Sequence, residues 1–152
     1  MKKALVFVVV TLALPASASA RTDGGRQLWF RWPAAGTMTS PYGHDGNRWH
    51  DGVDIGILRS LSVNAASSGT VVQTGYVPGY SGYGNVVLVD VGSGFSTLYA
   101  HLSRPTVRVG ARVEPGQRLG FAGCTGWCTG THLHFELRYR GRAVDPTALF
   151  AR

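Results

Sequence analysis

Residues 132–137 read His-Leu-His-Phe-Glu-Leu, a strict alternation of polar and apolar side chains. This alternation predicts a β-strand, because successive side chains of a strand point to opposite faces of the sheet. His132, His134 and Glu136 are then expected on one face, and the apolar residues on the face that packs against the core. Histidine pairs at this spacing also occur in ordinary sheets, so the motif alone does not distinguish a reactive site from a sheet surface.

The rest of the chain favours more β-structure. From Thr37 onward Gly and Pro recur every few residues, and no amphipathic stretch is long enough for a helix. Runs rich in Val, Tyr and Thr predict strands, a Gly-Ser-Gly hairpin loop is expected at 92–94, and one helical turn is expected near the end. The strands are expected at 70–76, 85–91, 95–101, 107–113, 118–122, 132–139 and, after Gly141, at 143–144, and the turn at 146–150. The predicted fold class is mostly β, a single compact antiparallel β-sheet domain with long loops forming a groove.

One folded domain is expected. A chain of 152 residues can bury one core and is short for two. We expect the domain at residues 32–150, preceded by a polar leader at 21–31 that packs on it as an edge strand and followed by a tail at 151–152.

Residues 1–20 have the pattern of a signal peptide. Lys2 and Lys3 form a positive start, residues 4–14 an apolar stretch, and Ala-Ser-Ala at 18–20 a small-residue cleavage site. The apolar stretch at 4–14 is shorter than the about 20 apolar residues that a bilayer span needs, so an uncleaved membrane anchor is the weaker alternative. The pattern predicts a secreted or periplasmic protein with no membrane span after signal cleavage.

The mature chain is expected to be moderately basic. Removing residues 1–20 takes two lysines away and lowers the formal charge from +7 to +5, with thirteen arginines against eight acidic residues. The arginines are scattered, and no dense basic run indicates nucleic-acid binding. Export makes anionic envelope polymers a better candidate partner, although an arginine-rich surface kept for solubility explains the charge equally well.

Cys124 and Cys128 are the only cysteines. In an exported chain, their spacing favours a tight disulfide loop. So small a loop would stabilise the fold modestly, and its expected role is to hold the backbone shape just before His132. The alternatives are a metal site built from the two thiolates, or a reduced and inert pair.

A second candidate motif is His-Asp-Gly-Val-Asp at residues 50–54. Residues four apart in an extended segment point to one face, so His50 and Asp54 could reach one ion, with Gly52 allowing close backbone approach. Alone, this pair is more often part of a solvated loop. Together with His134 it offers two imidazoles and one carboxylate, and three protein ligands leave a zinc position open, which marks a catalytic site.

Three segments, in order, resemble the lysostaphin-type (LytM-like) zinc metalloendopeptidases of bacterial cell walls. They are His-Asp-Gly-Val-Asp at 50–54, Tyr-Ala-His-Leu at 99–102 and Thr-Gly-Thr-His-Leu-His-Phe-Glu at 129–136. The likeness runs from about Trp32 to Asp145. The chain departs from the family pattern at the cysteine pair and at Thr131, where the family often carries proline. These departures put the shape of the loop in doubt. They do not affect any expected metal ligand.

The resemblance implies a zinc peptidase domain at 32–150 that holds one Zn²⁺ per chain. His50, Asp54 and His134 would be the metal ligands, and His101 and His132 the catalytic pair. One of the pair would serve as base and pass a proton to the leaving amine, and the other would stabilise the oxyanion. The sequence does not say which does which.

Several neighbouring residues have two readings each. Glu136 could orient a ligand through a hydrogen bond or be a simple surface carboxylate. His44 and Tyr42 could touch substrate or pack within their loop. The Gly- and Tyr-rich segment 79–84 could line a groove for an extended peptide, although turn chemistry alone would also explain its glycines.

The sequence therefore predicts a secreted or periplasmic zinc metalloendopeptidase that hydrolyses peptide bonds in peptidoglycan cross-links or stem peptides. One alternative is a non-cleaving member of the same fold that binds cell wall or regulates a partner hydrolase. Loss of a ligand would favour it, and all five positions are filled. Another is a basic β module that binds an anionic envelope polymer and holds no stoichiometric zinc. The loops, rather than the ligands, would decide which bond is cut, and the sequence does not reveal that bond.

Overall fold

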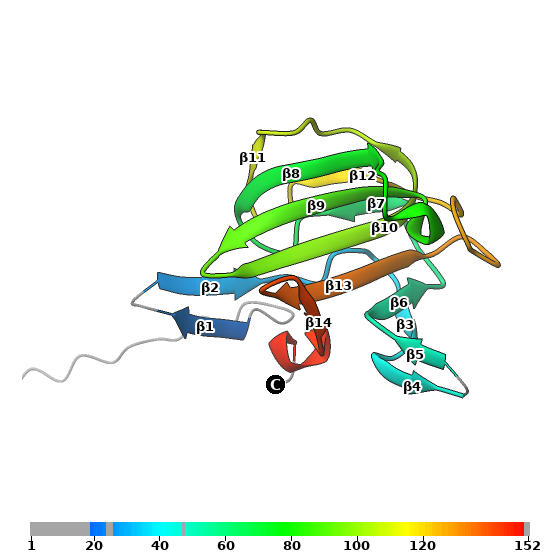
Figure 1. The fold of residues 1–152 in the computed structure, drawn as a ribbon, viewed down its shortest axis with the longest axis horizontal. Helices are drawn as coiled ribbons and strands as arrows, with labels where there is room; N and C mark the ends of the chain where they lie inside the picture. The colour runs from blue at the N-terminus through cyan, green and yellow to red at the C-terminus, as the bar shows by residue number, and fades with distance from the viewer. Residues whose placement is uncertain (1–18, 24–25, 47, 151–152) are drawn as a thin grey trace, which may run out of the picture.

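A ten-stranded antiparallel sheet forms the main body of the fold (Figure 1). The computed structural model describes residues 19–23, 26–46 and 48–150. Seven strands lie in the order β11-β8-β9-β10-β13-β6-β3, and β7, β12 and β14 pair off this path. Their bounds are β3 (Thr37–Ser40), β6 (Val53–Gly56), β7 (Ser62–Asn64), β8 (Gly69–Tyr76), β9 (Asn85–Gly92), β10 (Phe95–Pro105), β11 (Arg112–Val113), β12 (Arg118–Ala122), β13 (Leu133–Tyr139) and β14 (Arg142–Val144). The predicted mostly-β fold class is confirmed, and the described residues form no α-helix.

Four short strands and two 3₁₀ helices lie outside this sheet. β1 (Ser19–Asp23) pairs with β2 (Arg26–Phe30), and β4 (Gly43–Asp45) pairs with β5 (Arg48–His50). The 3₁₀ helix η1 (Ser81–Tyr83) lies between β8 and β9, and η2 (Pro146–Leu149) follows β14. In the part of the chain that the structure describes, no helix is long and apolar enough to span a bilayer.

β10 and β13 lie at the centre of the sheet because most of their side chains are apolar and can be buried on both faces. β10 is buried from Thr97 to Leu102, and β13 from Leu133 to Leu137. Burying a large apolar side chain contributes about 1.5–3 kcal/mol relative to leaving it in water. The alternation in β13 predicts a strand with one polar face, and the structure covers that face as well, since Tyr83 packs against His134.

Most predicted strands are confirmed, and one is largely wrong. The expected strands at 70–76, 85–91, 95–101, 118–122, 132–139 and 143–144 appear as β8, β9, β10, β12, β13 and β14, with the expected helical turn as η2. Of the segment 107–113, only Arg112–Val113 is strand. There Gly110 takes a positive φ of 85°, and the Ala111 N–H donates to the Arg108 carbonyl. This turn interrupts the extended backbone that the valines favour.

The prediction that residues 21–31 add an edge strand to the domain is wrong. β1 and β2 pair with each other in a separate two-stranded sheet. The hairpin is joined to the main core at its end, where Phe30 is buried and the Arg31 N–H donates to the Ala66 carbonyl. The predicted signal peptide falls mainly on residues 1–18 and the tail on 151–152, which lie outside the described residues, so these boundaries stay predictions.

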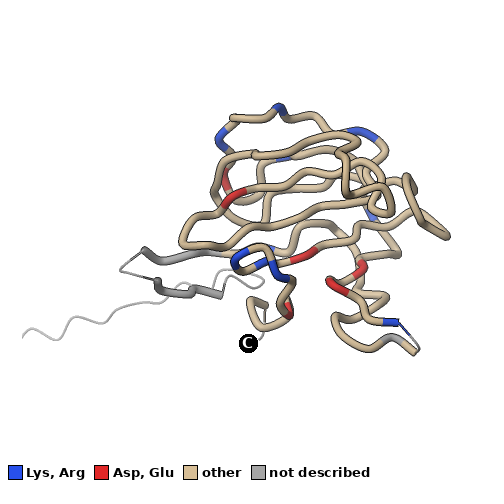
Figure 2. Tube along the Cα trace, viewed as in Figure 1, with Lys and Arg blue, Asp and Glu red and all other residues tan. Residues whose placement is uncertain are grey.

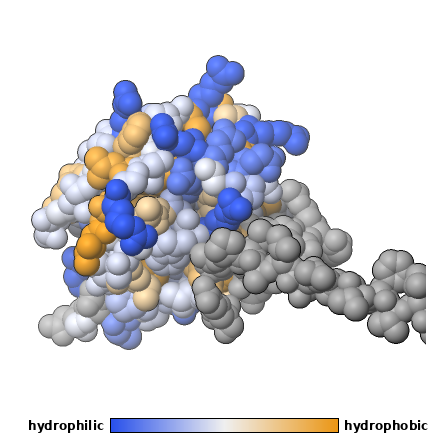
Figure 3. All heavy atoms as spheres, turned by 180° about the vertical axis from the view of Figure 1, so that it is seen from behind, coloured by the Kyte–Doolittle hydropathy of each residue, from blue (hydrophilic) through white to orange (hydrophobic). Residues whose placement is uncertain are grey.

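Arginines are spread over several strands and loops (Figure 2). Of the arginines whose side chains the structure describes, only Arg138 forms an ion pair. Arg104 and Arg118 lie over Phe121, with 5.2 and 5.3 Å between guanidinium carbon and ring centre. On the face seen from behind, hydrophilic side chains project between smaller apolar areas (Figure 3). This distribution agrees with a sequence that lacks a dense basic run.

The strand order brings distant segments to one place. β13 lies between β10 and β6, and its register sets His134 opposite Ala100 on one side and Asp54 on the other. His101 directly follows Ala100, and His50 ends β5 just before β6 begins. Segments that are 80 residues apart in sequence therefore meet across neighbouring strands.

Candidate metal centre

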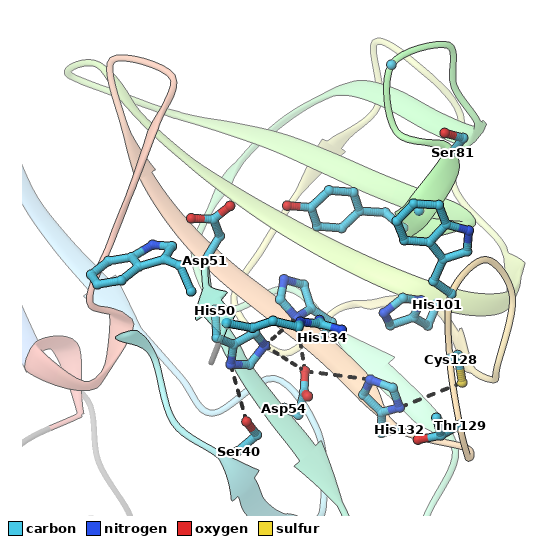
Figure 4. A pocket seen from close by; sticks show the side chains of 16 residues that line it. Ser40, His50, Asp51, Asp54, Ser81, His101, Cys128, Thr129, His132 and His134 are labelled. Atoms are coloured by element: carbon cyan, nitrogen blue, oxygen red, sulfur yellow. Dashed lines mark hydrogen bonds and ion pairs between the residues drawn. The ribbon is translucent and has the colours of Figure 1, made fainter. Parts of the chain in front are cut away.

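Three donor atoms converge where β5, β6 and β13 meet (Figure 4). His50 Nε2 lies 3.2 Å from Asp54 Oδ1, and His134 Nδ1 lies 2.9 Å from the same oxygen. The two nitrogens are 3.0 Å apart. The three residues predicted as ligands thus form one group that could hold a metal ion.

His50 and Asp54 meet through a bend in the backbone, and not along one extended segment as their spacing predicts. His50 and Asp54 do not share one extended strand, because a bend at Asp51 and Gly52 separates β5 from β6. Gly52 packs against β13 so closely that a Cβ there would collide with the Phe135 carbonyl oxygen and lie 3.0 Å from His134 Cε1. A glycine is needed at the bend for the two segments to meet.

Backbone and side-chain acceptors orient the two imidazoles that are predicted as ligands. His50 Nδ1 lies 2.7 Å from the Pro41 carbonyl oxygen, which can only accept, so Nδ1 carries the proton and Nε2 is free to bind an ion. His134 Nε2 lies 3.0 Å from Glu136 Oε1, which leaves Nδ1 as the free nitrogen. In both rings, the nitrogen that faces the group is the one left for a metal.

The donor set fits zinc. Two imidazole nitrogens and a carboxylate oxygen are ligands that zinc takes in catalytic sites. Tetrahedral bonds of about 2.0–2.2 Å separate donors by about 3.3–3.6 Å. The separations of 2.9, 3.0 and 3.2 Å are slightly shorter, so side-chain shifts of a few tenths of an ångström would accommodate the ion.

The electrostatics of the group favour a positive charge. Burial would raise the pKa of Asp54, but hydrogen bonds from His134 and His50 outweigh it and hold that pKa well below its usual range. Burial would lower the pKa of His134, but hydrogen bonds to Asp54 and Glu136 raise it to about 9. The carboxylates therefore stay ionised near neutral pH and attract a cation, whether a proton or a metal ion.

His101 sits at an irregularity in β10. Its φ of 58° is left-handed, and the pairing of β10 with β9 shifts register between Tyr99 and Leu102. Such a bulge turns a side chain out of the regular alternation. His101 Nδ1 lies 2.8 Å from the Thr125 carbonyl oxygen, so Nε2 is the free nitrogen. Burial lowers the pKa of His101, which keeps the imidazole neutral near neutral pH.

His132 lies beside His101, immediately before β13. The ring centres of the two histidines are 4.8 Å apart, and His132 Nε2 is 3.6 Å from Asp54 Oδ1. His132 Nδ1 lies 2.7 Å from the Gly130 carbonyl oxygen, so its Nε2 is also free. The structure therefore brings together all five predicted site residues, each with one ring nitrogen or carboxylate oxygen available.

A cavity of about 650 Å³ opens onto these side chains (Figure 4). A volume of this size is typical of clefts that bind small ligands or peptide segments. Segment 79–84 forms one wall through Gly79, Ser81, Gly82 and Tyr83, which is the first of the two alternatives for this segment. Trp49 and Trp127, which are 53% and 85% exposed, also line the cavity and offer apolar surface to a bound molecule.

The structure decides between the readings of three neighbouring residues. Glu136 is fully buried, with 0% of its surface exposed, and is therefore not a surface carboxylate. His44 and Tyr42 do not line the described cavity. Both pack against Trp49, with ring centres 5.1 and 5.4 Å apart, which is the loop-packing alternative.

Several residues of the site were not predicted. Pro41, Thr125 and Gly130 act through their carbonyl oxygens, and every residue carries a carbonyl, so no side-chain pattern could indicate them. Arg138, whose Nε donates to Glu136 Oε2, continues the alternation of His134 and Glu136. Extending the period of two by one step would have identified it.

The predicted disulfide between Cys124 and Cys128 is present. Its loop contacts both of the predicted catalytic histidines. Thr125, inside the loop, accepts the hydrogen bond from His101, and Cys128 Sγ lies 3.9 Å from His132 Nδ1. The loop is therefore part of the site's framework.

Comparison with models of known protein families identifies the family of this chain. The model of peptidase family M23 matches residues 48–146, which hold all five site residues. The chain belongs to this family. The predicted likeness to the lysostaphin-type peptidases is thereby confirmed.

Curated relatives of the M23 chain include both peptidases and an activator. The chain is 40% identical to an uncharacterized metalloprotease of Haemophilus influenzae over 99 residues. This match covers 65% of the chain and 20% of the relative. The chain is 36% identical to the DD-carboxypeptidase/endopeptidase Mpg of Neisseria meningitidis, over 74% of this chain and 26% of the relative. It is 32% identical to the murein hydrolase activator NlpD of Salmonella typhimurium, over 90% of this chain and 35% of the relative. The chain thus spans a fifth to about half of the length of such curated relatives.

Solved structures agree with the family assignment. Lysostaphin from Staphylococcus simulans superimposes with a TM-score of 0.68 at 32% identity, covering 76% of this chain and 49% of that one. A zinc-containing peptidase from Vibrio cholerae superimposes with a TM-score of 0.70 at 28% identity, covering 89% of this chain and 47% of that one. The second structure adds support for zinc as the ion that suits this site.

Proposed function

We propose that this M23 protein is a secreted or periplasmic zinc metalloendopeptidase that hydrolyses peptide bonds in the cross-links or stem peptides of peptidoglycan. The observation that carries the proposal is the complete set of site residues. Three donors converge on one point, and two further histidines turn free nitrogens toward the same cavity. A protein that only binds cell wall has no need for the second pair of histidines.

His50, Asp54 and His134 would hold the zinc ion. When bound, zinc supplies Lewis acidity that polarises an amide carbonyl and lowers the pKa of water. The Pro41 carbonyl and Glu136 fix the two ligand rings, which keeps their free nitrogens aimed at one point.

The catalytic pair would handle the proton and the developing charge. His101 is neutral near neutral pH because burial lowers its pKa, so its Nε2 is suited to take a proton from the attacking water. It can then return that proton to the leaving amine. His132 would stabilise the developing oxyanion in its imidazolium form, because its Nδ1 already donates to the Gly130 carbonyl and Nε2 needs a second proton to act as a donor.

The exposed aromatic side chains suit an extended peptide substrate. Trp49 and Trp127 line the cavity together with Arg48 and Asp51. A peptide strand offers apolar methylene and methyl groups to the tryptophans, and charged termini or side chains to the two ionic residues. An envelope location is supported by the disulfide, which forms in oxidising compartments, and by relatives named for murein and lipoprotein roles.

The test is digestion of purified peptidoglycan by the mature protein, with and without a chelator and with zinc added back. We expect new free amines that disappear with the chelator and return with zinc, and the fragment masses would name the bond. His101→Ala should release none, and His44→Gln, which changes a histidine outside the cavity, should behave as wild type.

One other outcome would change the proposal. A protein that holds one zinc ion yet releases no amines would favour a non-cleaving role, such as that of the relative named as a murein hydrolase activator. Adding the protein to a purified murein hydrolase would then show whether it stimulates that enzyme. A protein with no stoichiometric zinc would refute the peptidase reading and favour a role in binding or regulation.

A further inference from the structure

Arg138 lies behind the metal centre and is not among the residues that line the cavity. Its Nε donates to Glu136 Oε2 at 2.6 Å, and its Nη1 donates to the Tyr80 hydroxyl at 2.8 Å. The guanidinium carbon also lies 5.3 Å from the centre of the Tyr80 ring. Arg138 belongs to β13, whereas Tyr80 immediately precedes η1. This one side chain therefore joins the strand that carries His134 to the segment that forms a cavity wall.

Glu136 connects Arg138 to the metal centre. It is fully buried, and its two carboxylate oxygens have different partners, since Oε1 accepts from His134 Nε2 and Oε2 from Arg138. Breaking a buried ion pair by removing one partner is strongly destabilising, because the other charge is left uncompensated. Without Arg138, Glu136 Oε2 loses its charged partner, and a shift of the carboxylate toward another partner alters its hydrogen bond with His134.

Two tyrosines complete the connection on the side of the wall. Tyr80 and Tyr83 pack with ring centres 5.7 Å apart. The Tyr83 ring lies 5.4 Å from the His134 ring, and its hydroxyl hydrogen-bonds to Glu136. Tyr83 also lines the cavity. The same group of side chains thus contacts His134 from behind and supports the wall beside it.

We propose that Arg138 is a positioning residue that fixes two parts of the site at once. Through Glu136 it orients His134, and through Tyr80 it holds the segment 79–84 in place as a wall of the cavity. Zinc binding and the order of this wall are then coupled, because both depend on the same buried carboxylate and guanidinium. The consequence for peptide cleavage rests on the proposed function, whereas the consequences for zinc binding and for the wall do not.

Three variants separate the two roles. Arg138→Gln removes the charge and should weaken zinc binding about ten- to a hundredfold, as losing a partner of a metal ligand does elsewhere. Tyr80→Phe removes only the hydroxyl that Arg138 reaches, so zinc affinity should stay within about threefold of wild type. Arg142→Gln is the control, because Arg142 lies on the neighbouring strand β14, is exposed and forms no ion pair in the described structure.

The readouts are zinc affinity, from competition with a chromogenic chelator, and amide hydrogen exchange of residues 79–84. We expect faster exchange of this segment in Arg138→Gln and Tyr80→Phe, where the η1 amides of Tyr83 and Gly84 lose support, and no change in Arg142→Gln. In wild type, adding zinc should slow exchange of the segment, and Arg138→Gln should lose most of this effect. If the protein cleaves peptidoglycan, KM should rise for Tyr80→Phe with kcat little changed.

The proposal is overturned if a cooperatively folding Arg138→Gln matches Arg142→Gln in both zinc affinity and exchange. Should Arg138→Gln fail to fold, Arg138→Lys takes its place. Lysine keeps a positive charge beside Glu136 but lacks the branched guanidinium group that also reaches Tyr80. This variant should therefore retain zinc affinity and loosen the wall. Wild-type behaviour of Arg138→Lys and Tyr80→Phe in the exchange experiment would overturn the proposal. Absence of peptidase activity would refute the proposed function and leave these two readouts intact.

Discussion

Removal of the Cys124–Cys128 disulfide should reduce activity far more than it reduces stability. The perturbation is the double replacement of both cysteines by serine. The loop that the bond closes carries Thr125, whose carbonyl accepts the His101 hydrogen bond at 2.8 Å and whose hydroxyl donates to the Leu102 carbonyl at 2.8 Å. The Trp127 N–H in the same loop donates to the Gly82 carbonyl. Freeing the loop therefore acts on His101 and on the cavity wall.

The magnitudes follow from loop size and contacts. The bond joins residues separated by four positions, and loop-closure entropy for so short a loop amounts to about 2 kcal/mol at 25 °C. The unfolding free energy should fall by no more than about that amount. Misplacing a catalytic group by about 1 Å can reduce turnover about a hundredfold. Since the loop supplies the one acceptor of His101 Nδ1, kcat should fall about ten- to a hundredfold. Zinc affinity should not change, because within the described residues none of the three proposed ligands hydrogen-bonds to the loop.

Three measurements on the same variant test this reasoning: urea unfolding, zinc competition and release of free amines from peptidoglycan. Treating wild type with a reductant should reproduce the loss of activity, and the serine variant should be insensitive to the reductant. Turnover within twofold of wild type, in a variant proven to lack the bond, would refute the view that the loop shapes the site. A loss of zinc would instead show that the loop supports the ligands.

Four further substitutions have definite expected outcomes. Asp54→Ala should lose zinc and activity together, whereas His101→Ala should lose turnover and keep zinc, and metal loss in His101→Ala would show the ligand assignment to be wrong. Gly52→Ala should lower the unfolding free energy by about 1–3 kcal/mol and weaken zinc binding, because its Cβ collides with β13. Gly130→Ala, where a Cβ meets nothing within 4 Å, is the matched control in urea unfolding. Tyr99→Phe should cost about 1–3 kcal/mol, because the Ala66 N–H and the Thr97 hydroxyl lose a buried acceptor. Burial raises the pKa of Tyr99 to about 12, above the value of about 10 in an unfolded chain, so its contribution to stability is complete below pH 10 and decreases as pH rises toward 12. Between pH 9 and 11 wild type should lose about 1.4 kcal/mol that Tyr99→Phe does not lose, and equal slopes in urea unfolding would contradict this.

Local sequence patterns predicted much of the fold. The alternation at 132–137 corresponds to β13, and the runs rich in Val, Tyr and Thr correspond to β8, β9 and β10, because side-chain period and β-propensity act within one segment. The prediction was wrong at residues 107–111, where a turn around Gly110 forms backbone hydrogen bonds with Val71 of β8. It was also wrong for the leader, whose two strands pair with each other. Pairing partners depend on segments far away in the chain, and short patterns carry no information about them.

The sequence by itself determined which chemical groups are available: two imidazoles and one carboxylate for a metal ion, two more imidazoles for proton transfer, and a pair of cysteines close enough to join. These are properties of residue type and local spacing. Only the tertiary structure decided how the groups are aimed. The left-handed backbone at His101 and the Pro41 carbonyl that holds the His50 ring arise where separate segments of the chain meet. The Gly130 carbonyl beside His132 and the link from Arg138 through Glu136 to His134 are local, with partners two residues apart, but they reach the metal centre only because β13 lies between β6 and β10. The orientation of a ring depends on the acceptor beside it, and for His101 the fold supplies that acceptor from a distant part of the chain, since Thr125 lies 24 residues away.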